Sequence, residues 1–312
     1  MRKINILAID GGGIRGVVAA QFLAELEKNI DKSIYDSFDI IAGTSTGAFI
    51  ALNIAANRET GANSASLYEH DIAKEIMDES FLDRIIPHAM LADPKYDGKG
   101  KRKVLTNTFA DKRILDIEKK VLVTSYDIIK RNIVVFKSWG GTDSIDNPLL
   151  VDIADASSAA PTYFPTVKIE STPDKWLIDG GMAANNPAMC AFSAALNLGY
   201  KIEEINLVSL GTGIMTRVPE DINEFGEKSQ TWGGLGWIEN GLVDHLFEGN
   251  TTSTEYFCEQ ILGDKYIRVN NKLTNASDDI DDVGRKNIAK LKEFGTELYN
   301  KFGSKTIDLI KS

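Results

Sequence analysis

The 312-residue chain has little cysteine and no long apolar run, and each shortage excludes a class of protein. Its two cysteines, Cys190 and Cys258, show no metal-binding spacing, so we expect buried thiols and neither a disulfide framework nor a metal site. No window of about 18 apolar residues exists, so no membrane span is expected. The apolar stretch Ile4 to Ile9 stops at Asp10, too short for the apolar core of a signal peptide, which favours a cytoplasmic protein.

Positive charges are outnumbered, with 35 lysine and arginine residues against 45 aspartate and glutamate residues. The net charge of −10 at pH 7 excludes a general nucleic-acid binder, because sequence-independent binding depends on neutralising phosphates with lysine and arginine. An anionic partner would need a local basic patch. The stretch Tyr96 to Lys103 is predicted to be a flexible loop, either simply solvated or contacting a phosphate or lipid headgroup. Its four candidate contacts are Lys99, Lys101, Arg102 and Lys103.

The sequence around Ser45 carries the clearest catalytic pattern. An apolar, β-branched run from Phe38 to Ile41 enters Gly-Thr-Ser-Thr-Gly at 43–47, and a helical pattern of small and apolar residues leaves it. This strand, sharp turn and helix are typical of a nucleophile elbow, so Ser45 is the candidate nucleophile. The alternative is a turn in which the small residues only permit close packing.

A glycine-rich loop follows the first expected strand, residues 3–9. It reads Asp-Gly-Gly-Gly-Ile-Arg-Gly at 10–16, and a helical pattern follows. Residues 11–16 satisfy the dinucleotide-binding pattern, but the second strand ends in Gly-Thr-Ser and its acid, Asp39, stands at the strand's beginning. We therefore favour an oxyanion hole. Its candidate donors are Gly11, Gly12 and Gly13, with Arg15 as a further anion-stabilising group.

A serine nucleophile needs a base, and the chain has only three histidines. His70 lies in a charged helical stretch, His88 follows a proline, and His245 lies in a Trp/Gly-rich segment, so none occupies a strand-end turn. Asp179, between an apolar stretch and two glycines, is the better candidate, acting with Ser45 as a dyad. Because an ordinary Asp is a weak base, the oxyanion hole must supply most of the rate. The alternative is a turn residue that bonds its own backbone.

Strand and helix patterns alternate along the chain. Strands are expected at 3–9, 38–42, 120–126, 132–137 and 205–210, and helical patterns at 65–86, 151–160 and near the C-terminus. This order predicts an α/β fold with a mainly parallel sheet covered on both faces and a site at the strands' carboxyl ends. The Trp/Gly-rich segment 230–262 is interpreted either as a helical cap on the core or as an acyl-chain contact or lid.

Three motifs in order, at 10–16, 43–47 and 179–181, resemble the patatin-like phospholipase family, as do residues 157–165 and 185–187. The resemblance covers about 4–215. It implies a three-layer α/β/α sandwich and a Ser-Asp dyad without histidine, formed by Ser45 and Asp179. It also implies an oxyanion loop of Gly11, Gly12, Gly13 and Arg15. A single domain over 1–312 is expected, with a motif-bearing core at about 4–215 and a C-terminal extension at about 216–312 that includes a candidate lid.

These observations predict a serine acyl hydrolase of phospholipase A or lysophospholipase type that contacts the inner membrane surface transiently and needs neither metal nor organic cofactor. A homo-oligomer is compatible with the sequence. The chain also resembles patatin-like effectors of bacterial antiphage defence that are activated by cyclic nucleotides, a ligand that the four basic residues would hold. The alternatives are an acyltransferase with the same dyad, a non-catalytic nucleotide-binding module using Gly11 to Gly16, and a regulatory or structural protein with a degenerate site.

Overall fold

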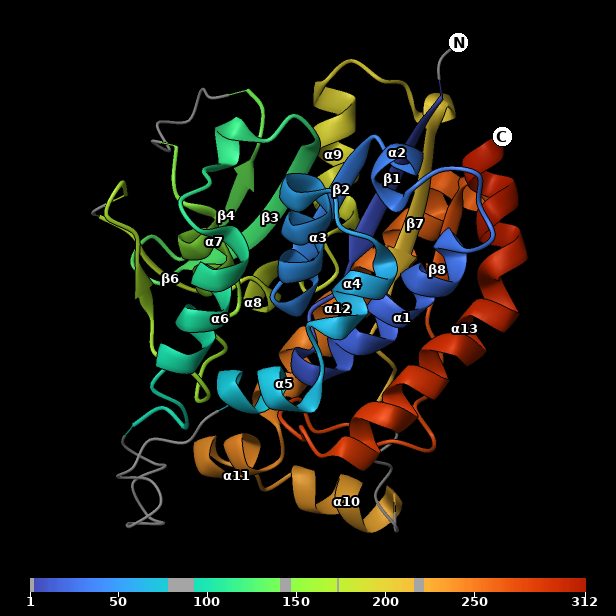
Figure 1. Cartoon of the computed structure of the whole chain (residues 1–312). Helices are drawn as coiled ribbons and strands as arrows, with labels where there is room; N and C mark the ends of the chain where they lie inside the picture. Colours follow the sequence, from blue (N-terminus) through green and yellow to red (C-terminus); the bar gives the residue numbers. More distant parts are fainter. Residues whose placement is uncertain (1–2, 78–92, 141–146, 173, 216–221) are drawn as a thin grey trace.

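The computed structural model describes residues 3–77, 93–140, 147–172, 174–215 and 222–312. One mixed sheet organises this part of the chain (Figure 1). Its strands are β1 Ile4–Ile9, β2 Ile40–Thr44, β3 Lys120–Asp127, β4 Asn132–Lys137, β5 Val167–Lys168, β6 Trp176–Asp179, β7 Ile205–Leu210 and β8 Tyr266–Val269. Strands β3, β2, β1, β7 and β8 pair in parallel, whereas β4 and β6 run antiparallel to β3, and β5 antiparallel to β6. The prediction of a mainly parallel sheet is confirmed.

Helices lie on both sides of this sheet (Figure 1). They are α1 Gly16–Glu27, α2 Ile34–Ser37, α3 Thr46–Asn57, α4 Gly61–Ser66, α5 His70–Ile76, α6 Lys99–Phe109, α7 Leu150–Ser157, α8 Gly181–Ala184, α9 Ala188–Asn197, α10 Ile222–Ser229, α11 Gly234–Glu239, α12 Leu242–Leu262 and α13 Arg285–Lys311. Helices α1 and α3 cover one face, and α9 with the C-terminal part of α12 covers the other.

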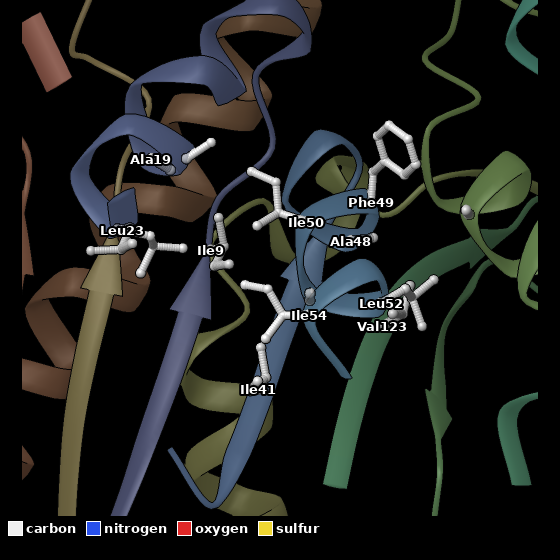
Figure 2. Close-up of a cluster of buried hydrophobic side chains, with 14 of the residues drawn as sticks. Ile9, Ala19, Leu23, Ile41, Ala48, Phe49, Ile50, Leu52, Ile54 and Val123 are labelled. Carbon is white, nitrogen blue, oxygen red and sulfur yellow. The ribbon is translucent and has the colours of Figure 1, made fainter. Parts of the chain in front are cut away.

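The strands separate two hydrophobic clusters, because successive side chains of a strand point to opposite faces. In β1, Leu7 and Ile9 join the cluster under α1 and α3, whereas Ile4 and Ile6 join the cluster under α9. Figure 2 shows the first cluster, with Ile54 of α3 lying between Ile9 of β1 and a residue of β2. Two packed faces on one sheet make a three-layer α/β/α sandwich, as predicted.

The last third of the chain completes this sandwich. Strand β8 pairs with β7 in the same sheet, and α13 packs along α1. The packing is close, since a Cβ at Gly295 would lie 2.7 Å from the carbonyl oxygen of Val18. Residues 216–312 therefore supply a strand and a covering helix, so 215 marks the end of the motifs and not of the fold.

Two predicted segments differ from the structure. The helical pattern of 65–86 is divided into the end of α4 and α5, and its part from 78 on lies outside the described residues. The basic stretch predicted to be a flexible loop begins helix α6 at Lys99. Val104, Leu105 and Phe109 are buried at helical spacing on this helix, and the charged residues before them concealed that pattern.

Candidate active site

Ser45 occupies a sharp turn between β2 and α3. Its backbone has φ 55° and ψ −121°, a conformation that a side-chain-bearing residue rarely adopts. Two glycines permit the turn: a Cβ at Gly43 would lie 2.6 Å from the amide nitrogen of Ala48, and one at Gly47 would lie 2.7 Å from the carbonyl oxygen of Asp10. The chain at Ser45 thus has the strand, strained turn and helix of a nucleophile elbow, as predicted.

Sheet register brings Asp179 to Ser45. Strand β4 occupies one edge of β3 from Leu122 to Asp127, so β2 and β6 must share the other edge. Strand β2 pairs as far as Thr44, opposite Thr124, and β6 ends at Asp179, opposite the next residue, Ser125. The carboxyl ends of β2 and β6 therefore meet head to head.

This meeting places Asp179 within hydrogen-bonding distance of the candidate nucleophile. The Ser45 Oγ donates to Asp179 Oδ2 at 2.7 Å. The two predicted dyad residues thus lie together, and β6 reaches this position by running antiparallel to β3.

Burial makes the Asp179 carboxylate a stronger base than a solvated one. Desolvation raises the pKa of Asp179 to about 6, opposed by hydrogen bonds from the Gly181 amide and Ser45 and by the charge of Lys101. The Gly181 N–H donates to Asp179 Oδ1 at 2.7 Å, which leaves Oδ2 facing the serine. The carboxylate is therefore mostly ionised at neutral pH and oriented toward the hydroxyl.

Lys101 is a buried cation beside this carboxylate. Its Nζ forms an ion pair with Asp155 at 3.0 Å, donates to the carbonyl of Ser158 at 3.1 Å and lies 4.2 Å from the ring centroid of Phe164. Burial lowers the pKa of Lys101, while Asp155 and Asp179 act in the opposite direction. The sequence pointed to Lys101 as an activator contact, whereas the structure places it next to the dyad.

The glycine loop lies beside Ser45, with the Cβ of Ser45 only 3.2 Å from where a Cβ on Gly11 would be. The Gly11 N–H donates to the carbonyl of Asn185 at 3.1 Å, so the expectation that it serves an oxyanion is wrong for this conformation. Within the described part of the chain, the N–H groups of Gly12 and Gly13 have no acceptor. The same holds for Thr46, the first residue of α3, which sequence reasoning missed although it directly follows the nucleophile.

Long-range bonds hold this loop in place. The Arg15 guanidinium lines the cavity above Ser45 and donates to the carbonyl of Gly213 at 3.3 Å. Asp10, which begins the loop, forms a buried bidentate pair with Arg268 of β8 at 2.6 and 3.0 Å. Arg268 was not identified from the sequence, because nothing near it marks a partner 258 residues away.

The two histidines that the structure describes take no part in this arrangement. His70 Nδ1 is bonded to the carbonyl of Val283 at 2.8 Å. His245 is exposed, with its ring edge-on to that of Trp237 at 6.3 Å. Neither lines the cavity that contains Ser45, and His88 lies outside the described residues.

An apolar cavity of about 570 Å³ opens over the dyad. The glycine loop, Ser45, Asp179 and Lys101 form its polar part. Apolar side chains of α3, α5, α6, α11 and α12 form most of the rest, including Phe49, Ile76, Leu105, Ile238, Leu242 and Phe247. The Trp/Gly-rich segment is thus a helical cap whose inner residues line the cavity, and a lid movement stays a prediction.

The four basic residues each have a carboxylate partner. Lys99 pairs with Asp97 at 2.8 Å and Lys103 with Glu75, while Arg102 pairs with Asp152 at 2.5 Å and with the Asp155 that also pairs with Lys101. The four cations are therefore all in ion pairs, and those of Lys101, Arg102 and Lys103 attach α6 to α7 and α5.

Three comparisons with known proteins agree. A family model described as "Patatin-like phospholipase" matches residues 7–192. Patatin-17 from Solanum cardiophyllum is 31% identical, over 96% of this chain and 84% of its own, and Patatin-like protein 2 from Oryza sativa subsp. indica is 29% identical, over 96% and 85%. The crystal structure of VipD from Legionella pneumophila shares the fold, with a TM-score of 0.50 and 12% identity over 97% of this chain and 67% of that one.

Proposed function

The chain belongs to the patatin-like phospholipase family of lipid acyl hydrolases, and we propose that Ser45 and Asp179 cleave fatty acyl esters of phospholipids in the cavity described above. The observation that carries the proposal is the 2.7 Å hydrogen bond from the Ser45 hydroxyl to the Asp179 carboxylate at the base of an apolar cavity of about 570 Å³. An apolar cavity of this size accommodates an acyl chain, and its few polar groups converge on the ester carbon.

In this mechanism the Ser45 Oγ attacks the ester carbonyl while Asp179 accepts the hydroxyl proton. The carbonyl oxygen becomes an oxyanion that accepts hydrogen bonds from the N–H groups of Gly12, Gly13 and Thr46, which have no other acceptor among the described residues, and each such bond contributes about 3 kcal/mol. The Arg15 guanidinium adds positive charge from the cavity wall. Asp179 returns the proton to the leaving lysophospholipid or alcohol, and water then cleaves the acyl-enzyme with the same base to release the fatty acid.

The test measures fatty-acid release from phospholipid vesicles and from a water-soluble short-chain ester. We expect Ser45→Ala and Asp179→Asn each to lower both rates at least about a thousandfold. Ser125→Ala is the matched control, because Ser125 is a buried serine opposite Asp179 whose hydroxyl bonds to a backbone carbonyl instead. Release that survives Ser45→Ala would overturn the serine mechanism.

The wild type and the Ser45→Ala variant also distinguish the proposed hydrolase from two alternative functions. A fluorophosphonate labels only an activated serine, so labelling of wild type but not of Ser45→Ala excludes a catalytically silent nucleotide-binding module at Gly11 to Gly16. Adding an alcohol or lysolipid acceptor distinguishes hydrolysis from acyl transfer, since transfer yields a new ester in place of free fatty acid.

Cyclic-nucleotide activation in antiphage defence is a finer proposal that rests on the sequence. Lys99 and Lys103 are the basic residues to test, because both are exposed and their ion pairs are solvated. If the nucleotide binds there, Lys99→Ala with Lys103→Ala removes the response and leaves the basal rate unchanged. A response that persists, or a wild type that does not respond, argues against this site.

A further inference from the structure

Three successive helices expose large apolar side chains. Leu235 and Ile238 of α11 are 75% and 61% exposed, Ile222 at the start of α10 is 68% exposed, and Trp237 and Leu246 are 41% and 47% exposed. Such side chains occur singly on most surfaces, but here five come from 25 consecutive positions, 222–246. We name these five residues the apolar cap surface.

This surface adjoins the mouth of the cavity. Ile238 both lines the cavity and is largely exposed, so it lies on the rim. Leu242, Val243 and Phe247, which follow it, line the interior, and Phe247 packs on Gly181, two residues from the candidate base. Figure 1 shows α10 and α11 at the end of the molecule, on the same side as α5, whose Ile76 also lines the cavity.

Aromatic contacts join the three helices to one another. The rings of Phe225 and Trp232 are 5.1 Å apart, those of Trp232 and Trp237 are 5.2 Å apart, and His245 continues the series at 6.3 Å from Trp237. Edge-on ring pairs of this kind stabilise the local packing. These contacts hold the three helices together, while Leu235, Ile238 and Leu246 remain exposed to solvent.

The charge around the surface is negative. Among the described side chains of 222–247 are three carboxylates, Glu224, Glu227 and Asp244, against one lysine, Lys228, which pairs with Glu224 at 2.6 Å. Such a segment repels anionic headgroups and phosphate backbones. Any attachment through it must come from burial of apolar side chains.

Resting on the proposed function, we infer that the apolar cap surface docks on the bilayer that holds the substrate, by inserting its aliphatic side chains between neutral headgroups. A phospholipid acyl chain can pass from the bilayer into the cavity without exposure to water only if the cavity mouth contacts the bilayer. The exposed residues continue directly from that mouth. Trp237, with an apolar body and a polar N–H, suits the headgroup level. Docking by apolar insertion is insensitive to salt and weakened by anionic lipid.

The experiment uses residues of the surface that do not line the cavity. The triple variant Ile222→Ser, Leu235→Ser, Leu246→Ser is compared with the control Leu115→Ser, Ile129→Ser, which removes apolar side chains that are 45% and 61% exposed elsewhere. Flotation with phosphatidylcholine vesicles, on a Ser45→Ala background, measures binding without hydrolysis. We expect the triple variant to lower the partition coefficient about 30-fold and the control to leave it unchanged.

Activity measurements on the same variants distinguish failure of this inference from failure of the proposed function. With Ser45 present, the triple variant should lose vesicle hydrolysis in proportion to binding and keep hydrolysis of a water-soluble ester within about twofold of wild type. Equal vesicle binding by triple variant and wild type overturns the inference, as does binding that needs anionic lipid and disappears in high salt. A dimer that the triple variant converts to a monomer assigns the surface to a second copy and also overturns it. If wild type does not hydrolyse the water-soluble ester, that result overturns only the proposed function.

Discussion

At the scale of single residues, the proposed mechanism makes the Asp179 carboxylate responsible for the acid limit of the reaction. Burial raises the pKa of Asp179 to about 6, so protonation below that pH removes the base. We predict that kcat/KM for a water-soluble ester is constant above pH 7 and falls about tenfold per unit below pH 6. A pH profile with no acid limb, or one near pH 4, would contradict a buried carboxylate base.

Lys101 provides a way to move that limit. Its charge favours the ionised form of Asp179, so Lys101→Met should shift the acid limb to higher pH, with about two- to fivefold less activity at pH 6 and little change at pH 9. Asp155 keeps a partner in this variant, because Arg102 Nη1 lies 3.1 Å from it. Arg102→Met is the matched control, since it removes a cation on the same helix that does not line the cavity. An equal loss at every pH would assign Lys101 to structure alone.

Burial of the Asp179 carboxylate also lowers the free energy of unfolding. Because the folded pKa of Asp179, about 6, exceeds the ordinary value of 3.8, ionisation destabilises the fold fully above pH 6 and not at all below pH 4. Asp179→Asn keeps an acceptor for the Gly181 N–H and removes the buried charge. We predict that the variant raises the free energy of unfolding by about 2 kcal/mol at pH 8 and by nothing near pH 4, measured by urea denaturation. A variant less stable than wild type at pH 8 would contradict this prediction.

Sequence alone pointed to Ser45 and Asp179 as a candidate pair, because each lies in a short local motif that contains glycines. It could not identify Arg268 or the role of Lys101, because their partners are set by the sheet and by the packing of α6. Gly11 was misassigned for a similar reason, since the carbonyl of Asn185 that takes its N–H comes from a distant turn. Residues within a short motif could therefore be predicted from the sequence, whereas polar contacts between distant parts of the chain could not.

At the scale of elements, the crossing of β2 and α3 depends on contact between backbones. A methyl group at Gly43 would meet the backbone of Gly47 and Ala48, which no side-chain rotation relieves. We predict that Gly43→Ala lowers the free energy of unfolding by at least about 3 kcal/mol. Gly249→Ala in α12 is the control: nothing lies within 4 Å of its added Cβ, so it should be stabilising by about 0.5 to 1 kcal/mol. Thermal or urea unfolding checks both, and a neutral Gly43→Ala would show that the elbow can relax.

Elements with clear periodicity were predicted well, as β3, β4 and β7 illustrate. Helix α6 was missed because its apolar residues follow four basic residues, three of which find their carboxylate partners only in the folded chain. The direction of β6 was also beyond the sequence, since a four-residue strand pairs equally well either way until its neighbours are known.

At the scale of the whole molecule, the buried pair of Asp10 and Arg268 joins the first strand to the last. No helix in the described part of the chain is both long and apolar enough to cross a bilayer. The pair fixes the start of the glycine loop and the end of β8 at one edge of the sheet. Residues 4–215 and 216–312 should therefore unfold together as one domain.

Breaking this pair tests that coupling. Arg268→Met leaves the Asp10 carboxylate buried without its cation, so we predict a loss of about 3 to 5 kcal/mol in the free energy of unfolding and one cooperative transition at a lower temperature. The double variant Asp10→Asn, Arg268→Met removes both charges and should recover part of that loss, because burying an unpaired charge costs more than losing the pair. Calorimetry on wild type and both variants measures this. Two separate transitions, only one of which Arg268→Met shifts, would mean that the C-terminal third unfolds independently of residues 4–215.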